Sequence, residues 1–383
     1  MRVVVTVPWA EPLGGAETML QGLLDGAREE GHELEVVFMQ DGSWPAALRA
    51  EGIDVAVIPA GRLRDPHRWL AAVLRLARLL RRRRPDLVLN WAAKTQLYGA
   101  PAAVLAGLRR QIVWWQHSIP SRNWLDVVAT LLPARAVGCT SEAAARAQRR
   151  LPGTPRTFVV AAGAPAPGET GRPAALSLPA GVPVVGLVGR LQPWKGQDRL
   201  LRAHALLRSR GQRLHTVLIG GDAYGLSSDY AAALPALVSE LGLDEEVTMT
   251  GQVDDAGPYI EALDVLVNAS EGEPFGIVLL EAMARGVAVL AVDAGGPAEL
   301  IQNGRTGVLA PSGEPRALAD ALAPLLASGA RRAELGRAGQ ERFQREFTDA
   351  AMRKRFFASL QALLGAEQPE LRSGGDHGVR RSS

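Results

Sequence analysis

Residues 265–283, VLVNASEGEPFGIVLLEAM, place a short apolar strand, a polar loop and an apolar helix in direct succession. A strand without polar alternation, followed at once by a helix, is typical of a parallel sheet that helices cover on both faces. Pro274 suits the first turn of a helix, so we expect the helix to begin there. The unpaired N–H groups of Phe275, Gly276 and Ile277 would then point beyond the end of the strand.

The same strand–helix unit recurs along the whole chain. A stretch rich in Pro, Gly and Ala, residues 166–182, interrupts the alternation and predicts a linker. We therefore predict an α/β protein with two doubly wound Rossmann-like domains, residues 1–165 and 183–346, that face a central cleft. The tail, residues 366–383, is rich in Ser, Gly and Arg and is expected to be disordered. The predicted strands are residues 3–8, 34–39, 54–58, 86–90, 111–116, 136–140, 184–188, 216–219, 247–250, 265–268 and 287–292.

Composition sets limits on the class of protein. The 383 residues are 47% apolar and 22% charged, which is typical of a soluble globular chain and predicts two domains from length alone. Cys139 is the single cysteine, so no intramolecular disulfide can form. No run approaches the length of a membrane span, and the N-terminus is too short for a secretory signal. We therefore expect a cytoplasmic protein.

The net charge of +3 comes mainly from arginine, because only Lys94, Lys195 and Lys354 are lysines among the 43 basic residues. Four arginines, residues 81–84, end a helical pattern just before Pro85. They are either a solvated helix end or part of a basic patch on the N-terminal domain that contacts an anionic acceptor or the inner face of a membrane. Nucleic acid is not an expected partner, since no reading motif accompanies the charge.

Glycines and cations follow the first strand of each half. Gly14 and Gly15 open the first helix, where the backbone can approach a ligand and free N–H groups can meet an anion, although a plain tight turn is the alternative. Arg190 and Lys195 follow the first strand of the second half. They can reach a pyrophosphate at the carboxyl edge of the sheet, or they are two solvated loop cations.

Carboxylates and one histidine lie after other strands. Glu273 stands at the entry of the predicted helix, where it faces the cleft or forms a capping box with Ser270. Glu281 projects among apolar neighbours, where a carboxylate needs hydrogen bonds such as those of ribose hydroxyls, unless it lies on an exposed helix face. His117 directly follows a buried strand and so reaches the same cleft, although a lone histidine is often structural.

Several of these segments, in this order, resemble the retaining GT-B glycosyltransferases of family 4. The resemblance covers nearly the whole chain before the tail. One departure is the Ala161-Ala162-Gly163-Ala164-Pro165 step before the linker, where the family often has polar residues. The segments that carry the likeness are Gly14-Gly15-Ala16-Glu17, His117-Ser118, Gly189-Arg190 with Lys195-Gly196, Glu273 with Glu281, Gly295 to Leu300, and Asn303 to Pro311.

The resemblance implies the transfer of a sugar from a nucleotide-diphosphate donor, a UDP-sugar favoured and a GDP-sugar possible, to a hydroxyl acceptor. The acceptor, a saccharide, a lipid-linked or a small molecule, would lie on the first domain. The reaction would retain the anomeric configuration and need neither metal nor cofactor, and the sequence has no Asp-x-Asp pair. The last helix, residues 347–365, would cross back to the first domain. The alternatives are a GT-B epimerase, a pseudo-sugar coupling enzyme and an inactive nucleotide-sugar-binding protein.

The resemblance also implies a role for each site residue. Arg190 and Lys195 would bind the diphosphate and stabilise the leaving group. Glu281 would hold the ribose, and Val253 would lie near the base. The catalytic set would be His117, Arg190, Lys195 and Glu273. The donor-binding set would be Gly14, Gly15, Arg190, Lys195, Val253, Glu273, Phe275, Gly276, Ile277, Val278 and Glu281.

Overall fold

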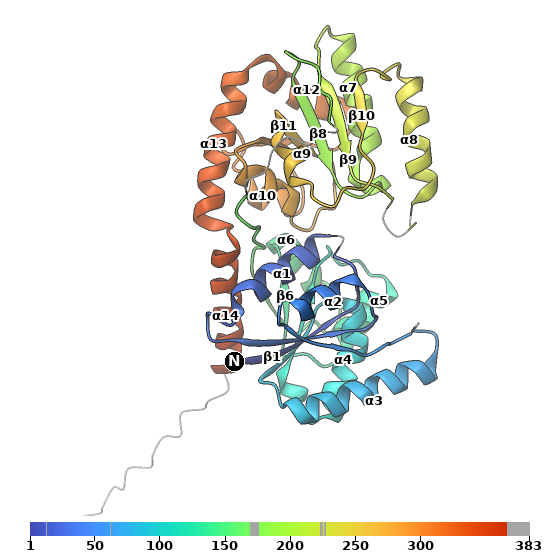
Figure 1. The fold of residues 1–383 in the computed structure, drawn as a ribbon, viewed down its shortest axis with the longest axis vertical. Coiled ribbons are helices and arrows are strands. Elements are labelled where there is room, and N and C mark those ends of the chain that lie inside the picture. Colours follow the sequence, from blue (N-terminus) through green and yellow to red (C-terminus); the bar gives the residue numbers. More distant parts are fainter. Residues whose placement is uncertain (13, 62, 169–175, 223–224, 226, 366–383) are drawn as a thin grey trace, which may run out of the picture.

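The computed structural model describes residues 1–12, 14–61, 63–168, 176–222, 225 and 227–365. Each half of the chain forms one parallel sheet covered by helices, and the two halves stack end to end (Figure 1). The predicted fold class is therefore confirmed. The predicted tail, residues 366–383, and residues 169–175 of the predicted linker lie outside the described residues.

The N-terminal sheet has seven parallel strands in the order β3-β2-β1-β4-β5-β6-β7. Its strands are β1 (Arg2–Val7), β2 (Glu33–Phe38), β3 (Asp54–Val57), β4 (Leu87–Asn90), β5 (Ile112–Gln116), β6 (Ala136–Cys139) and β7 (Arg156–Val159). The helices of this half are α1 (Gly15–Ala27), α2 (Ser43–Ala50), α3 (Pro66–Arg83), α4 (Ala93–Leu105), α5 (Trp124–Leu131) and α6 (Glu142–Arg149), with the 3₁₀ helix η1 (Arg109–Gln111).

The C-terminal sheet has six parallel strands in the order β10-β9-β8-β11-β12-β13. Its strands are β8 (Val184–Val188), β9 (His215–Ile219), β10 (Val247–Met249), β11 (Val265–Asn268), β12 (Ala288–Val292) and β13 (Val308–Ala310). The helices are η2 (Pro193–Lys195), α7 (Gln197–Ser209), α8 (Ser228–Glu240), α9 (Gly257–Glu261), α10 (Ile277–Ala284), α11 (Pro297–Leu300), α12 (Pro315–Ala327), α13 (Gly329–Glu346) and α14 (Asp349–Gly365).

The strand order reverses beside the first strand of each half. β1 pairs with β2 on one side and β4 on the other, and β8 lies between β9 and β11. Adjacent loops leave such a point in opposite directions and open a crevice at the carboxyl ends of the strands. The loops after β1 and β8 carry the two glycine-rich segments that the sequence singles out, so the fold directs both to this crevice.

Both sheets are apolar because helices cover their two faces. Tryptophans fill much of the N-terminal core, where Trp91 stacks on Trp115 with 5.6 Å between ring centroids and Trp114 is fully buried. Burying aromatic rings of this size supplies a large part of the hydrophobic stabilisation of a domain. Most of the tryptophans of this half are therefore core residues.

The chain crosses between the halves twice, and the two crossings touch. The backbone N–H of Ala164 donates to the carbonyl of Phe347 at 3.1 Å, and Ala164 pairs with Thr348 in a parallel bridge. Beyond this point α14 packs on α1, and Arg353 donates to the carbonyl of Gly22 at 2.8 Å. Figure 1 shows α13 and α14 following one another along one side of both halves.

Candidate active site

A cavity of about 410 Å³ lies between the two halves at the carboxyl ends of β1, β5, β8 and β11. The N-terminal half contributes the loop before α1 and the segment after β5, and the C-terminal half contributes the loops after β8 and β11. Its lining residues are Trp9, Gly14, Gly15, Ala16, Glu17, Met19, His117, Ser118, Ile119, Thr140, Arg190, Trp194, Lys195, Gly272, Glu273, Pro274, Phe275, Gly276 and Ile277.

An ion pair lies on the C-terminal side of this cavity. The Nζ atom of Lys195 lies 2.7 Å from Oε2 of Glu273, and the two side chains are only 15% and 10% exposed. The same oxygen accepts a hydrogen bond of 3.3 Å from Nδ2 of Asn268, and the Lys195 ammonium lies 4.1 Å from the centre of the Trp194 ring. These contacts fix both charges in place before any ligand arrives. Glu273 therefore does not form the capping box with Ser270.

The helix after β11 starts later than the sequence predicts. We expected a helix from Pro274, but α10 begins at Ile277, because Gly276 adopts a left-handed backbone with φ of +95°. No side chain caps this helix, so the N–H groups of its first turn need another partner. Since Gly276 and Ile277 line the cavity, that partner can be an anion within it.

Gly15 brings the two halves together on the opposite side of the cavity. A Cβ atom at Gly15 would lie 3.0 Å from Cδ1 of Ile277, so a larger residue here would have to displace the end of that side chain, and glycine allows the close approach of the loop before α1 to the start of α10. At Gly14 a Cβ atom would lie 3.0 Å from Oε2 of Glu17.

His117 lies against the aromatic core. Its ring centroid is 4.7 Å from that of Trp91, and its Nε2 atom is buried without a hydrogen-bond partner among the described residues. Burial lowers the pKa of His117 to about 3, so the imidazole is neutral at pH 7. A neutral ring that lines a cavity and has an unsatisfied nitrogen can exchange a hydrogen bond with a ligand hydroxyl.

The structure brings nine of the twelve predicted residues to the cavity, and Val253, Val278 and Glu281 do not line it. Glu281 lies in the second turn of α10, where burial raises the pKa of its carboxyl, Arg285 lowers it and the nearby Asp255 raises it again. Glu281 therefore lies near the loop after β10 that also carries Val253. Glu281 and the loop with Val253 thus lie outside the cavity lining, and Val278 directly follows the lining residue Ile277.

Glu17 closes the segment of residues 14–17, but its sequence position alone did not mark it as a site residue. It lines the cavity from the first turn of α1, and burial raises the pKa of its carboxyl, while its own backbone hydrogen bond and Arg190 lower that pKa. The signal is present in the sequence, since an acidic residue stands among the core-facing positions Met19, Leu20 and Leu23 of the same helix.

Glu299 joins the halves outside the cavity. Its carboxylate accepts N–H groups from Glu142 at 2.8 Å and Ala143 at 2.7 Å, at the first turn of α6. A negative charge at a helix N-terminus is favourable because it meets unpaired N–H groups and the positive end of the helix dipole. The segment before Glu299 also reaches the cavity, because the N–H of Gly296 donates to the carbonyl of Glu273 at 3.0 Å.

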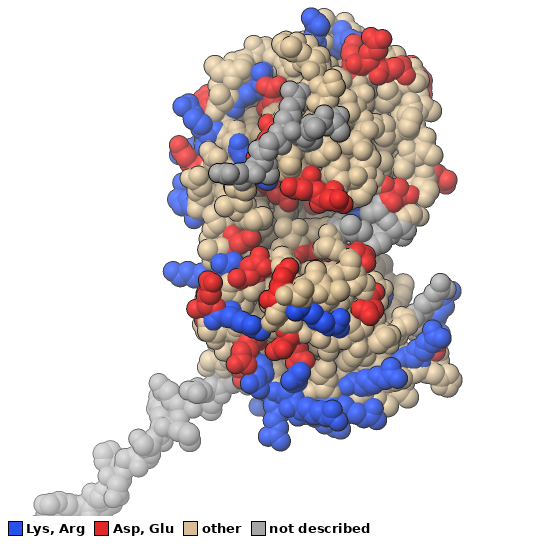
Figure 2. Space-filling model, in the orientation of Figure 1, with Lys and Arg blue, Asp and Glu red and all other residues tan. Residues whose placement is uncertain are grey.

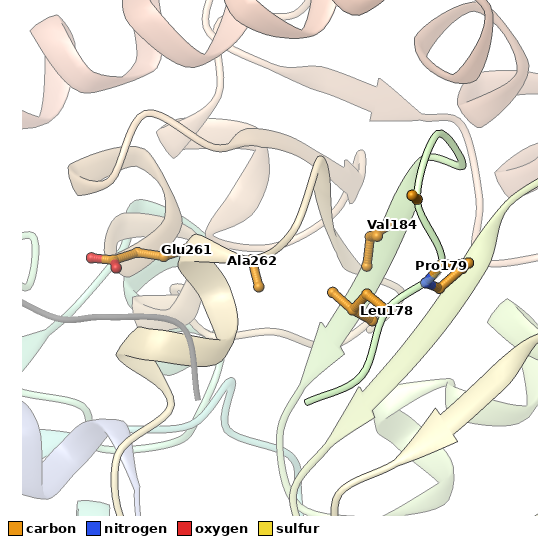
Figure 3. Close-up of a pocket in the computed structure, with 6 residues that line it drawn as sticks. Leu178, Pro179, Val184, Glu261 and Ala262 are labelled. Atoms are coloured by element: carbon orange, nitrogen blue, oxygen red, sulfur yellow. The ribbon is translucent and has the colours of Figure 1, made fainter. Parts of the chain in front are cut away.

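A second cavity, of about 390 Å³, lies near the start of the C-terminal half and is lined by Leu178, Pro179, Ala180, Val184, Glu261 and Ala262. Figure 3 shows the carboxylate of Glu261 pointing away from the apolar side chains. Polar groups do not converge there, so it is not a candidate active site.

Within the described part of the chain, no group of three or more His, Cys, Asp or Glu side chains is arranged to hold a metal ion. No described helix has the length and apolarity needed to span a membrane.

Two family models match the chain. The model "Glycosyltransferase Family 4" matches residues 13–164, and the model "Glycosyl transferases group 1" matches residues 172–342. Each thus corresponds to one of the two sheets.

Curated relatives match part of the chain. A D-inositol 3-phosphate glycosyltransferase of Nocardia farcinica is 38% identical over 167 residues, which are 43% of this chain and 37% of the relative. One of Kineococcus radiotolerans is 38% identical over 195 residues, 47% of this chain and 45% of the relative. The matches thus span less than half of these relatives.

Solved structures match over more of the chain. Anabaena HepE in complex with UDP and glucose has a TM-score of 0.82 and 26% identity, and the match covers 94% of this chain and 100% of that one. Sucrose-phosphate synthase of Thermosynechococcus elongatus, with a TM-score of 0.76, 22% identity and coverage of 96% and 100%, shares the fold. The two family models, with the paired sheets and the cleft between them, show that the chain belongs to the family 4 glycosyltransferases of GT-B fold.

Proposed function

We propose that the protein transfers a sugar from a nucleotide-diphosphate donor, a UDP-sugar favoured and a GDP-sugar possible, to a hydroxyl acceptor, with retention of configuration and without a metal ion. The observation that supports it most is the cavity itself, where two cations, a buried carboxylate and an uncapped helix N-terminus converge. The UDP and glucose that HepE binds favour the uridine donor.

The charges of the cavity suit a diphosphate leaving group. Arg190 forms no side-chain hydrogen bond to another described residue, and Lys195 keeps donors beyond its bond to Glu273. When the bond between the anomeric carbon and the phosphate oxygen breaks, negative charge grows on the diphosphate. The two cations and the N–H groups of Gly276 and Ile277 stabilise this charge more strongly in the transition state than in the ground state.

The polar groups around these cations suit a sugar. The carboxylate of Glu273 can accept hydrogen bonds from sugar hydroxyls while Lys195 and Asn268 hold it in position. Neutral His117 can donate to or accept from a hydroxyl on the other side of the cavity. Glu281, Val253 and Val278, which lie outside the cavity lining, would meet the nucleoside, with the Glu281 carboxylate on the ribose.

A retaining reaction places the attacking hydroxyl on the same face of the sugar as the leaving group. The acceptor oxygen bonds to the anomeric carbon as the phosphate oxygen departs, and the proton of the hydroxyl passes to that phosphate oxygen. The products are the glycoside and the nucleoside diphosphate. This route needs no separate base, and the two cations do the electrostatic work that a metal ion does elsewhere.

Binding and turnover test the proposal. Thermal unfolding with UDP, GDP and their sugars identifies the donor, because a ligand that binds only the folded chain raises its stability. With that donor, Lys195→Ala should lower kcat/KM at least tenfold, whereas Lys354→Ala, an exposed lysine on α14, should not. NMR of the product reports the anomeric configuration, and a chelator should leave the rate unchanged. Stabilisation by no nucleotide, or equal rates for both lysine variants, would overturn the proposal.

A further inference from the structure

A tryptophan in the loop after β8 forms part of the cavity wall. Trp194 belongs to the 3₁₀ helix η2, lines the cavity and is 38% exposed. Its ring has a defined orientation, because Nε1 donates to Oε1 of Gln192 at 2.9 Å. The backbone of the loop is tied as well, since the N–H of Lys195 donates to the carbonyl of Gln192 at 2.9 Å. Trp194 therefore presents its indole ring beside Lys195 in one orientation.

The side chain of Lys195 makes contacts along its length. Its aliphatic part passes Gly189, where a Cβ atom would lie 3.6 Å from Cδ and 3.7 Å from Cε of Lys195. Its ammonium lies 4.1 Å from the centre of the Trp194 ring and 2.7 Å from Oε2 of Glu273. A lysine side chain has a flexible four-carbon stem, so one contact alone would not fix its ammonium. The glycine, the ring and the carboxylate together give the charge one place in the cavity.

The two partners of the ammonium differ in charge. Glu273 offers a negative charge, so it also competes with the phosphate oxygens of a ligand for Lys195. The face of the Trp194 ring attracts a cation through its quadrupole and carries no net charge. The ring can therefore keep its contact with the ammonium while a phosphate replaces the carboxylate.

Competing carboxylates make such a neutral partner useful. Glu17 and Glu273 both line the cavity. On the face in view, Figure 2 shows further acidic side chains along the junction where Figure 1 places the boundary of the two halves. Without the ring contact, the flexible side chain of Lys195 would distribute its ammonium among several acceptors and would meet a diphosphate less often.

We propose that Trp194 is a positioning residue for Lys195. The ring holds the ammonium at the cavity wall when Glu273 gives up its bond and turns to the sugar hydroxyls. The ammonium then keeps its full charge for the diphosphate, where negative charge grows as the leaving group departs. The inference rests on the proposed function, because a nucleoside diphosphate is the ligand that Lys195 would meet.

A stacking role for Trp194 leads to a different expectation. A ring that stacks on the base would contribute equally to the binding of uridine and UDP, since both carry that base. A ring that positions Lys195 acts on the diphosphate and leaves uridine unaffected. The ammonium already lies over a face of the ring, which favours positioning. Comparison of the two ligands separates the two roles.

Fluorinated tryptophans inserted at position 194 alone test the proposal on the full chain. Each fluorine withdraws electron density from the ring face and changes its shape little, so the attraction for the ammonium falls in steps. In calorimetry the Kd for UDP should rise in the same steps, by about three- to tenfold for the most fluorinated ring, and the Kd for uridine should stay constant. GDP and guanosine replace UDP and uridine if thermal unfolding selects them. The matched control carries the same rings at Trp124, which is exposed on α5 outside the cavity lining, and should bind UDP like the wild type.

Ordinary substitutions supply a second measurement. Trp194→Phe keeps a π face and should retain more UDP affinity than Trp194→Leu, which is apolar but has no such face. In a chain that already carries Lys195→Ala, Trp194→Leu should cause no further loss, because Trp194 acts through the ammonium. Thermal unfolding checks that each variant is folded, and the partly exposed position of Trp194 favours survival of the fold.

A flat fluorine series, equal Kd values for the Phe and Leu variants, or an additive loss in the double variant would overturn the proposal. So would a parallel rise in the Kd for uridine, which would assign Trp194 to the base, or an equal response at Trp124. Wild-type UDP affinity and turnover in Lys195→Ala would instead count against the proposed function itself. The two failures are therefore distinguishable.

Discussion

Glu299→Gln should weaken ligand binding in a cavity that the residue does not touch. The wild-type carboxylate bridges the two halves through the N–H groups of Glu142 and Ala143. A charged group at a helix N-terminus contributes about 0.3–1 kcal/mol when it is exposed, and a capping group about 1 kcal/mol. Glu299 is exposed, so we take about 1 kcal/mol for the contact, and its loss should favour separation of the halves by about fivefold.

Calorimetric titration with UDP and small-angle scattering of the free chain measure this effect. Because both halves line the cavity, a ligand that bridges them binds only when they are together. The Kd should therefore rise by up to about fivefold, depending on how often the halves are already apart in the wild type, and the radius of gyration of the free variant should increase. Ser141 still caps α6 by accepting the N–H of Ala144 at 3.1 Å, so the helix itself should remain folded.

Glu341→Gln, at an exposed position on α13, is the matched control and should leave both quantities unchanged. If Glu299→Gln gives the wild-type Kd and the wild-type scattering curve, the contact with α6 does not hold the halves together. An increase in Kd with no change in scattering would also contradict the reasoning, since the effect would then not act through separation of the halves.

Three further predictions follow from burial and close packing. Asp349 lies at the start of α14 with its pKa raised by burial from 3.8 to about 6, so the folded chain binds more protons than the unfolded chain in this window. The free energy of unfolding should therefore fall as pH rises from about 4 to about 6, and urea unfolding of Asp349→Asn should lack this fall. Gly15→Val should press against the side chain of Ile277 and raise the Kd for UDP at least tenfold in calorimetry. The control is Gly52→Val, where the Cβ position has open space but the backbone has a positive φ. This variant should lower stability and leave the Kd unchanged. Burial lowers the pKa of His117 to about 3, so His117 should not ionise between pH 5 and 8. Any step near pH 6.5 in the profile of kcat/KM against pH should therefore persist in His117→Ala.

Sequence patterns could predict which candidate side chains would gather around one cavity, because these side chains lie directly after strands. The apolar runs that became β1, β5, β8 and β11 fix where each chain segment leaves its sheet, and parallel strands deliver their carboxyl ends to one edge. For this reason Gly15, His117, Lys195 and Glu273, which are far apart in the sequence, could be expected around one cavity. The apolar periodicity of the helices predicts which helix face is buried, but it does not predict which residues reach the cavity.

The failures have physical causes. Strands β7 and β13 escaped prediction; both lie at sheet edges with half-exposed positions that weaken the apolar signal, although the equally exposed edge strands β3 and β10 were predicted. The start of α10 was placed too early because the left-handed backbone of Gly276 overrides the preference of Pro274 for a first helical turn. Glu299 escaped because its partners stand 157 and 156 residues away, across a domain interface. No local pattern records such a contact.

The paired crossings at Ala164 and Thr348 have a mechanical consequence. Two chain connections at separate places would define a single hinge axis and confine the halves to rotation about it. Here the crossings are bonded to one another, so the chain connections restrain the halves at one place and leave rotation about more than one axis open. Contacts away from the crossings, among them the Glu299 contact with α6 and the Gly15–Ile277 approach, together with any bound ligand, then help to set the angle between the halves.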